Sequence, residues 1–387
     1  MSIYLDNSAT TKISKCALEK YIEVSEECFG NPSSLHKAGH DAELILKAAR
    51  AELLSAVGQR DGTVIFTASG SEANNLAIIG RALSKKRYRG ARIITTDSEH
   101  ASINEPLKYL SEQGFEIVKI STRGGKIDRS ELEGAMNERV ILVSVMLVNN
   151  ETGALYDTAE VGRIMREKAP EAILHVDATQ GFLKLPFTKK SIGADLITVS
   201  SHKIHGPKGI GALIVDKQVT VSRGISPIIF GGGQEMGLRS GTENVPAIAA
   251  FAEAVKEGRA NLNERFEHIS ALRDKLVSII AQEPALSQIS PTLPEKHAPH
   301  ILNITVPAIK SETLLHYLSS EGIFVSSGSA CSSNSHALSS ALIAYGRSEK
   351  EADSSIRISF SHENCEDDVR ALTDALARAL SKLARIR

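Results

Sequence analysis

Short apolar runs alternate with amphipathic segments from about residue 45 to residue 220. The runs that predict strands are residues 63–68, 92–97, 115–121, 140–148, 173–178, 195–200 and 210–216. Most are too uniformly apolar for a sheet with one wet face, which is typical of strands covered on both faces. Helical patterns lie between them, so we predict an α/β fold with a mostly parallel seven-stranded sheet. The last two runs are joined too closely for a helical crossover, which predicts an antiparallel part.

The order of elements changes after a long helical pattern over residues 246–281. The later elements are predicted as strands at 300–307, 323–328 and 354–360 and helices at 311–322 and 367–386. This order is typical of a smaller α+β domain. We therefore predict a large domain at residues 15–260 and a small domain made of residues 1–14 and 261–387.

Composition narrows the functional classes. The 387 residues are 42% hydrophobic and 24% charged, with a formal net charge of −1, which gives no support for binding nucleic acid or an anionic membrane. No apolar run approaches the ~20 residues that span a bilayer, and the N-terminus lacks the pattern of a signal peptide. The four cysteines are widely spaced without a CxxC pair, so we expect a cytoplasmic protein with reduced thiols.

One cysteine has unusual neighbours. Cys331 lies in "SSGSACSSNS", residues 326–335, among small and polar residues. A buried structural cysteine belongs among apolar neighbours, so this stretch predicts a reactive thiol on a flexible tether. What the thiol reacts with has to come from the rest of the chain.

Several predicted strands end in residues that can do chemistry, and the carboxyl ends of parallel strands meet at one edge of a sheet. "TASGSEANN" places Gly70 and Ser71 where a helix begins, which suits a phosphate, although a plain helix cap explains the same pattern. His100 in "DSEHASI" has a structural role as its alternative, and Asn150 in "VNNETG" a turn-forming one. Asp177 in "HVDATQG" needs a cationic or N–H partner if it is buried.

The segment "TVSSHKIHGPKG" is the most specific of these. Lys203 follows a strand directly, with Ser200 and His202 before it as possible phosphate donors, and so it is a candidate Schiff-base nucleophile. A phosphate turn, this lysine, the carboxylate of Asp177 and the amide of Gln180 together match the needs of pyridoxal 5'-phosphate, PLP. No G-x-G-x-x-G follows a predicted strand and no G-x-x-x-x-G-K-[ST] occurs, which argues against dinucleotides and nucleoside triphosphates.

Longer motifs resemble those of a known family over nearly the whole chain. They are "YLDNSATT", "GNPSSLHKAG", "EANNLAI", "EHASINEP", "NNETG", "VDATQG", "SSHKIHGPKGIGAL", "GGGQEMGLRSGTENVP", "SSGSACSS" and "SSIRIS". The sequence resembles the NifS/IscS group of cysteine desulfurases, in the class V aminotransferase superfamily. The resemblance implies the fold type I of PLP-dependent transferases, a homodimer, and transfer of sulfur from L-cysteine to a persulfide on Cys331, with L-alanine as product.

The resemblance also implies roles for matching residues. Cys331, Lys203 and His100 are catalytic, and Cys331 is also a possible transient ligand of iron or an iron–sulfur cluster. The implied cofactor-binding residues are Gly70, Ser71, His100, Asn150, Asp177, Gln180, Ser200, His202, Lys203 and Thr242, the last reaching the phosphate of the neighbouring subunit. Asn150 and Arg357 would hold the substrate carboxylate, for which the planar fork of Arg is suited. The expected partner is a sulfur acceptor or an iron–sulfur scaffold protein.

Other readings remain open at this point. A selenocysteine lyase or a direct C–S lyase of the same fold would not need a persulfide-forming cysteine, so "SSGSACSS" argues against both without excluding selenocysteine as a substrate. An aminotransferase has no use for Cys331. A scaffold protein that has lost its activity predicts loss of at least one of Lys203, Asp177, His100 or Arg357, and all four are present.

Overall fold

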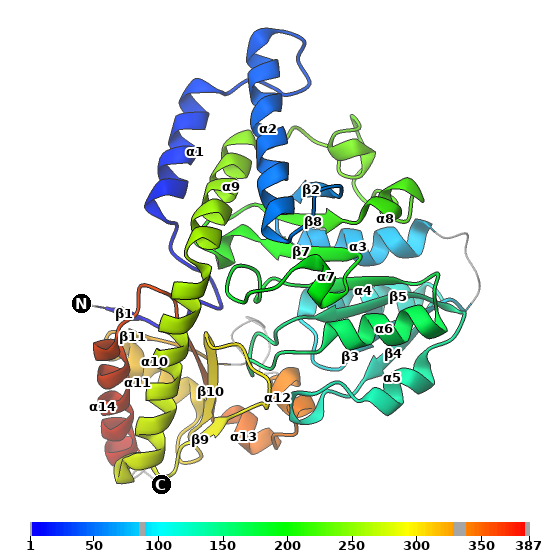
Figure 1. The fold of residues 1–387 in the computed structure, drawn as a ribbon. Coiled ribbons are helices and arrows are strands. Elements are labelled where there is room, and N and C mark those ends of the chain that lie inside the picture. The colour runs from blue at the N-terminus through cyan, green and yellow to red at the C-terminus, as the bar shows by residue number, and fades with distance from the viewer. Residues whose placement is uncertain (1, 85–89, 328–337, 384–387) are drawn as a thin grey trace.

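The seven-stranded sheet carries the predicted parallel strands. The structure, a computed structural model, describes residues 2–84, 90–327 and 338–383 (Figure 1). The strands of this sheet are β2 (Thr63–Thr67), β3 (Arg92–Thr96), β4 (Glu116–Ile120), β5 (Val140–Met146), β6 (Ile173–Asp177), β7 (Leu196–Ser200) and β8 (Gly211–Val215). Their order is β2-β8-β7-β6-β5-β3-β4. β8 runs antiparallel to both of its neighbours, which confirms the predicted antiparallel part.

Helices cover both faces of this sheet. They are α1 (Lys15–Glu27), α2 (Lys37–Ala56), α3 (Gly70–Ser84), α4 (Ala101–Glu112), α5 (Arg129–Ala135), α6 (Thr158–Lys168), α7 (Lys189–Ile192), α8 (Lys217–Val221) and α9 (Val245–Ala260). Alternate residues of β2 show the two faces: Val64 and Phe66 belong to the core with α1, α2, α6 and α9, whereas Ile65 belongs to the core with α3 and α4. Burial on both sides explains why the strands are uniformly apolar.

A smaller sheet lies below the larger one in Figure 1. It contains β9 (Ser290–Thr292), β10 (Ile301–Thr305), β12 (Ser326–Ser327) and β13 (Ser355–Ser359), and a separate pair joins β1 (Ile3–Tyr4) to β11 (Ile323–Phe324). The helices of this part are α10 (Leu262–Gln282), α11 (Ser311–Ser320), α12 (Ser340–Tyr345), α13 (Glu349–Asp353) and α14 (Glu366–Leu383). Leu5 packs into the same core as α10, α11 and α14, so the N-terminal segment contributes to this part of the molecule.

Two sequence predictions need correction. The helical pattern over 246–281 is two helices that meet at Asn261, where the side-chain amide donates to the carbonyl of Glu257 at 3.0 Å. Asparagine side chains compete for backbone groups in this way, which interrupts a helix that the apolar spacing would continue. The predicted strand 323–328 is split between two sheets, into β11 and β12.

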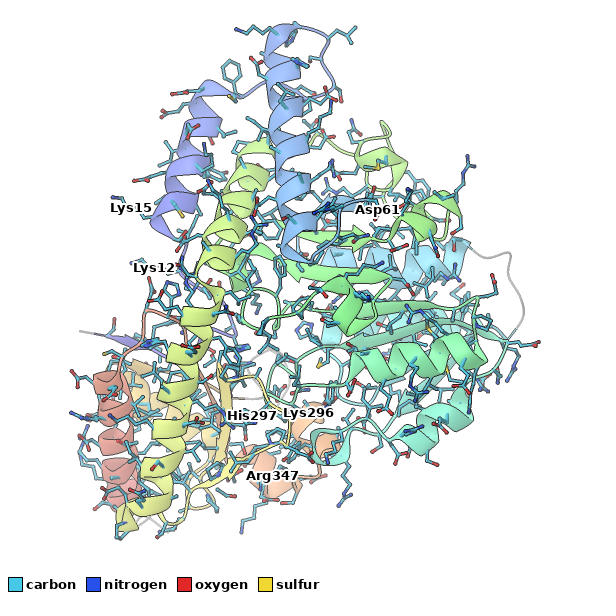
Figure 2. All side chains as sticks on the ribbon, in the orientation of Figure 1. Lys12, Lys15, Asp61, Lys296, His297 and Arg347 are labelled. Atoms are coloured by element: carbon cyan, nitrogen blue, oxygen red, sulfur yellow. The ribbon has the colours of Figure 1, made fainter. Side chains whose placement is uncertain are left out.

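The N-terminal segment connects the two sheets. It leaves β1, passes Lys12 and enters α1 at Lys15, whereas Lys296, His297 and Arg347 lie on the small-sheet side (Figure 2). Backbone bonds tie this segment to both parts: Asn7 N–H donates to the carbonyl of Ser359 at 3.3 Å, and Thr11 N–H donates to the carbonyl of His202 at 2.9 Å. No helix within the described ranges is long and apolar enough to cross a membrane.

Candidate active site

A cavity of ≈280 Å³ opens where β5, β6 and β7 end and the N-terminal segment crosses them. Its lining includes ten of the residues selected from the sequence: Gly70, Ser71, His100, Asn150, Asp177, Gln180, Ser200, His202, Lys203 and Arg357. Thr242 is exposed and does not line this cavity. Cys331, and with it the suggested iron ligand, lies outside the described residues.

Asp177 ends β6 with its carboxylate held from two directions. Its Oδ1 accepts the backbone N–H of Thr179 at 2.9 Å, and its Oδ2 accepts the side-chain amide of Asn74 at 2.9 Å. The side chain is buried, with 7% of the residue exposed. Two neutral donors fix the direction of the carboxylate without neutralising it, so it can still pair with a positively charged ligand atom.

The first turn of α3 and the end of β7 form a tight polar corner. A Cβ added at Gly70 would lie 3.2 Å from Cβ of Ser200, and one at Gly211 would lie 2.7 Å from the backbone nitrogen of Gly70. The Oγ of Ser200 is buried and has no hydrogen-bond partner among the described residues. A helix N-terminus with an unpartnered hydroxyl beside it is suited to bind the oxygen atoms of an anion.

His202 lies beside this corner, in the short 3-10 turn η2 (Ser201–Lys203) that follows β7. Burial, together with the positive charges of Lys203 and Lys208, lowers the pKa of His202 to about 4. Its Nδ1 lies 3.1 Å from Oγ1 of Thr10. The ring is therefore neutral at physiological pH and acts through a hydrogen bond rather than a charge.

His100 caps α4 and has a defined tautomer. Its Nδ1 accepts the backbone N–H of Ser102 at 3.1 Å and lies 2.8 Å from Oγ of Ser102. Burial lowers the pKa of His100, although the carboxylate of Asp177 opposes that change. Since Nδ1 accepts, the proton of the neutral ring resides on Nε2. Asn74 donates to both Ser102 and Asp177, so one amide aligns the histidine and the carboxylate.

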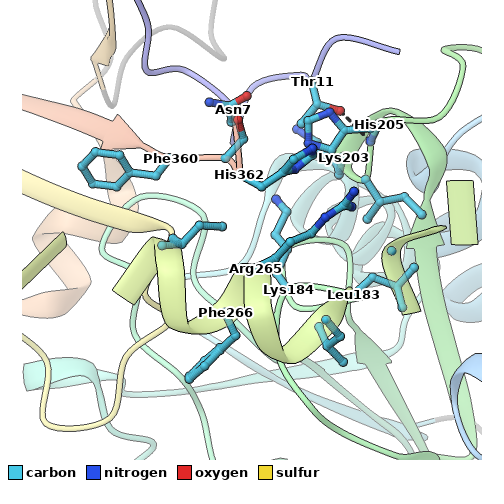
Figure 3. A pocket seen from close by; sticks show the side chains of 15 residues that line it. Asn7, Thr11, Leu183, Lys184, Lys203, His205, Arg265, Phe266, Phe360 and His362 are labelled. Atoms are coloured by element: carbon cyan, nitrogen blue, oxygen red, sulfur yellow. Dashed lines mark hydrogen bonds between the residues drawn. The ribbon is translucent and has the colours of Figure 1, made fainter. Parts of the chain in front are cut away.

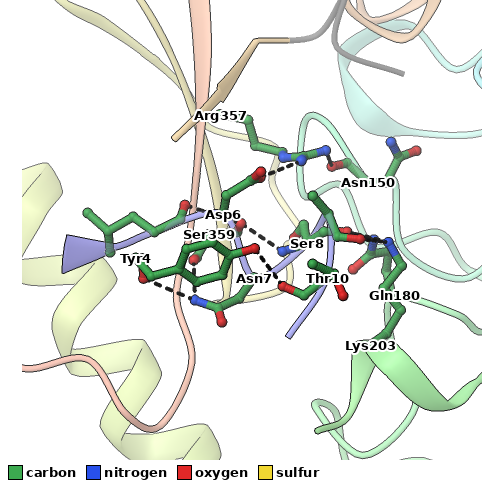
Figure 4. Close-up of polar contacts among 12 residues, drawn as sticks. Tyr4, Asp6, Asn7, Ser8, Thr10, Asn150, Gln180, Lys203, Arg357 and Ser359 are labelled. Atoms are coloured by element: carbon green, nitrogen blue, oxygen red, sulfur yellow. Dashed lines mark hydrogen bonds and ion pairs between the residues drawn. The ribbon is translucent and has the colours of Figure 1, made fainter. Parts of the chain in front are cut away.

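Lys203 lies at the end of η2, and the N-terminal segment supplies acceptors for its ammonium group. Its Nζ donates to the carbonyls of Ser8 at 2.6 Å and Ala9 at 2.7 Å (Figure 4). The amide Nε2 of Gln180 donates to the same Ser8 carbonyl at 2.9 Å. These bonds place the amine inside the cavity, between the C-terminal end of β7 and the N-terminal segment.

Arg357 reaches the cavity from the centre of the small sheet. One guanidinium nitrogen donates to Oδ1 of Asp6 at 2.9 Å, and another donates to the carbonyl of Asn150 at 3.0 Å (Figure 4). Only 4% of the Arg357 side chain is exposed. Its Nε has no partner within the described ranges, so the group retains donor capacity for a ligand carboxylate.

The two described ends of the segment that contains Cys331 lie near Arg357. At one end, Ser326 in β12 pairs with Arg357 in β13. At the other end, Oγ of Ser339 donates to the carboxylate of Glu151, next in sequence to Asn150. Burial raises the pKa of Glu151, while the charge of Arg357 opposes this.

Sequence reasoning missed three side chains that support the site. Asn74 and Ser102 connect His100 to Asp177, and Asp6 pairs with Arg357. All three lie within or beside quoted motifs, "EANNLAI", "EHASINEP" and "YLDNSATT". Their residue types alone did not mark them as functional, because serine, asparagine and aspartate are also common in ordinary turns and helix caps.

Comparison with known proteins identifies similar chains. The sequence profile of the family described as "Aminotransferase class-V" matches residues 3–372. A "NifS/IcsS protein homolog" from Lactobacillus delbrueckii is 37% identical, over 98% of this chain and 98% of its own. "Cysteine desulfurase IscS 1" from Archaeoglobus fulgidus is 36% identical, over 98% and 97%. A solved structure entitled "NIFS-LIKE PROTEIN" aligns with a TM-score of 0.90 and 35% identity, over 98% of this chain and 100% of the other. One entitled "SspA in complex with cysteine" has a TM-score of 0.80 and 30% identity, over 94% and 100%.

Proposed function

We propose that this chain, which belongs to the aminotransferase class-V family and to its NifS/IscS group, is a cysteine desulfurase. It removes sulfur from L-cysteine, releases L-alanine and retains the sulfur as a persulfide on Cys331. The observation that carries the proposal is the cavity that unites Lys203, Asp177, His100 and Arg357. A nucleophilic amine, a fixed carboxylate, a neutral imidazole and a guanidinium with spare donors are the groups needed to process a free amino acid.

The residues present fit PLP as the cofactor. Lys203 would carry it covalently, Asp177 would face its pyridine nitrogen, and the unpartnered hydroxyl of Ser200 beside Gly70 would meet its phosphate. Bound PLP supplies an electron sink for the bonds at the substrate α-carbon. Gln180 would donate its amide N–H to the phenolic oxygen.

The protein side chains then perform the binding and proton transfers. Arg357 binds the substrate carboxylate through the donors that Asp6 and the Asn150 carbonyl leave free. Lys203 Nζ takes the Cα proton, and the carbonyls of Ser8 and Ala9 are placed to hold the resulting ammonium. A lysine that both binds covalently and moves a proton needs such a resting site, because an unpaired ammonium in a closed pocket is costly.

Cys331 supplies the sulfur nucleophile in this proposal. Its thiolate attacks the substrate sulfur; the S–S bond forms, the C–S bond breaks, and a proton at Cβ completes L-alanine. The described ends of its segment lie beside Arg357 and Glu151, next to the expected position of the substrate carboxylate. A sulfur acceptor, such as an iron–sulfur scaffold protein, would then remove the outer sulfur, and Cys331 would be the transient site of any iron bound in that transfer.

The surface supports a homodimer. Large apolar side chains are exposed on the α1–α2 connection and on the 226–243 segment, namely Phe29 at 78%, Leu35 at 104% and Phe230 at 79%. Large apolar side chains with so much exposed surface are candidates for an interaction surface. Thr242 lies on the same segment, consistent with a role at the phosphate of the neighbouring subunit. Location in the cytoplasm stays a prediction.

A product analysis tests the proposed reaction. The purified protein, loaded with PLP, is given L-cysteine without a reductant, and alanine, pyruvate and free sulfide are quantified. One alanine per subunit with little free sulfide is the expected first turnover. Pyruvate with an equal amount of free sulfide, formed at a rate unchanged in Cys331→Ala, would indicate a direct C–S lyase instead. Faster alanine release from L-selenocysteine than from L-cysteine would favour the selenocysteine lyase alternative.

A further inference from the structure

Lys184 lies behind the proposed cofactor site and has no role in the reaction described above. We propose that Lys184 is a positioning residue, which holds the Gln180 carboxamide so that its NH2 group faces the cofactor side of the cavity. The inference rests on the proposed function, because the orientation matters only if Gln180 meets the phenolic oxygen of PLP. It concerns how the donor at that oxygen is kept in place.

The backbone after β6 brings the two side chains together. The backbone N–H groups of Gly181 and Phe182 donate to the carbonyl of Ala178 at 2.9 and 2.8 Å. The backbone N–H of Lys184 donates to the carbonyl of Gly181 at 3.1 Å. These successive turns place residues four apart on one side, as in a helix. Leu183 lies within these turns in a left-handed conformation with φ 54°, and the backbone N–H of Leu185 still donates to the carbonyl of Gly181 at 3.0 Å.

The hydrogen bonds of Gln180 define which amide atom faces which partner. Lys184 Nζ donates to Oε1 of Gln180 at 3.4 Å, while Nε2 of Gln180 donates to the Ser8 carbonyl at 2.9 Å. The Ser8 carbonyl can only accept, so it fixes Nε2 of Gln180 on its side, and Lys184 Nζ then meets Oε1 as a donor. That orientation leaves the second N–H of the amide available in the cavity shared with Lys203.

The surroundings of Lys184 on the side away from Gln180 explain why its hydrogen-bond partner is an amide. Lys184 lines a separate small cavity of ≈30 Å³, room for about one or two waters, together with Lys203, His205, Arg265 and His362 (Figure 3). The ionisable side chains that line this cavity are predominantly basic. Arg265 already forms an ion pair with Glu257. Burial, together with the charges of Lys203 and Arg357, lowers the pKa of Lys184 to about 7, and burial keeps His205 neutral with a pKa of about 4.

Removing Lys184 should therefore change the cofactor's own titration. Without its donor, the Gln180 amide can rotate and present Oε1 to the phenolic oxygen, where two acceptors repel. Loss of a donor to the phenolic oxygen stabilises the protonated form of the linked cofactor. Its apparent pKa should rise by about one pH unit and PLP should bind about tenfold more weakly, the usual worth of one hydrogen bond to a charged group.

The experiment uses the full chain with PLP and follows the visible band that PLP acquires on linkage to Lys203. The band is titrated from pH 6 to 10, and the PLP dissociation constant is measured, in wild type, Lys184→Met and Lys184→Arg. Lys190→Met is the matched control, because it makes the same substitution at an exposed lysine on α7. We expect the shift in Lys184→Met, restoration in Lys184→Arg and wild-type behaviour in Lys190→Met. Circular dichroism reports folding, and Lys184→Gln replaces any variant that fails to fold.

A double-mutant cycle separates positioning from a general structural role. Gln180→Met should shift the titration as Lys184→Met does, and the double variant should add little, because both remove one interaction. A visible band that titrates normally in Lys184→Met, or shifts that simply add in the double variant, would overturn the inference and leave the proposed function intact. A wild-type protein that forms no visible band with PLP would instead overturn the proposed function, and this inference with it.

Discussion

The cofactor half of the site and the substrate half are assembled in different ways. Asp177 ends β6, and Lys203 ends η2, the turn after β7. The strands β6 and β7 are adjacent in one sheet, and the Asp177 carboxylate accepts the N–H of Thr179, two residues further on. Arg357 depends on Asp6 and Asn150, which are separated from it by 351 and 207 residues. The large sheet alone brings Asp177 and Lys203 together, and the N-terminal segment then supplies the acceptors for Lys203. The second half exists only after the small sheet, the N-terminal segment and the large sheet pack together.

This difference predicts separate consequences for activity. Changes in the cofactor half should reduce the chemical step, because its groups touch the reacting atoms. Changes in the substrate half should mainly weaken L-cysteine binding and raise KM. The predictions below test that division, beginning with the largest effect.

Lys203→Ala should abolish the visible band of bound PLP and reduce kcat by on the order of 10³-fold or more, because it removes both the covalent link and the proton acceptor. Lys217→Ala is the control, since this side chain is 62% exposed on the surface. Absorbance and alanine release are the measurements. Substantial alanine release by Lys203→Ala would remove the distinction between the two halves, because the chemical step would then not depend on the lysine that follows β7.

Arg357→Lys should raise KM for L-cysteine by about 10- to 100-fold with a smaller change in kcat, because lysine keeps the charge but loses the planar fork. The PLP band should remain as in wild type. Arg378→Lys, in an ion pair on the exposed face of α14, is the matched control. An equal loss in kcat with KM unchanged would place Arg357 in the chemical step and contradict the division.

The cofactor half was accessible from the sequence and the substrate half was only partly so. Asp177 and Lys203 were recognisable because each follows an uninterrupted apolar strand, and such strand ends meet at one edge. Arg357 in "SSIRIS" was assigned only by resemblance, since nothing local marks an arginine in a strand as a ligand. Its pairing with Asp6 was missed because it depends on packing between distant segments, which no local pattern encodes.

Asp6→Asn tests the support of Arg357 more gently. Asparagine keeps an acceptor oxygen for the Arg357 guanidinium, which lies 2.9 Å from Oδ1 of Asp6, but it lacks the negative charge. Arg357 should then be oriented less firmly, and KM should rise about three- to tenfold. Asp61→Asn serves as the control, because Asp61 is exposed and lies far from the small sheet (Figure 2). If KM stays at the wild-type value while Arg357→Lys raises it, Asp6 has no orienting role.

Glu257→Gln tests the connection between α9 and α10, the helices that link the large-sheet and small-sheet regions. Glu257 on α9 pairs with Arg265 on α10 across Asn261, and these contacts, with the Cys16 thiol, lower the pKa of Glu257 to about 2 despite burial. A depressed carboxyl pKa stabilises the folded state above the unfolded value near 4.5, and the benefit is lost as the pH falls toward about 2. Thermal unfolding at pH 7 should occur about 1–3 °C lower in the variant, and the difference should narrow below pH 4.5. A difference that is constant from pH 7 to pH 3 would contradict this.

The sulfur-transfer step is the central claim, and mapping the sulfur after one turnover tests it most directly. PLP-loaded protein is mixed with one equivalent of L-cysteine without reductant, alkylated, digested and analysed by mass spectrometry. We predict a persulfide on Cys331 in an amount equal to the alanine released, its absence in Cys331→Ala, and no effect of Cys365→Ala, which removes an exposed thiol elsewhere in the chain. Alanine released at the wild-type rate with no sulfur on Cys331 would contradict the account.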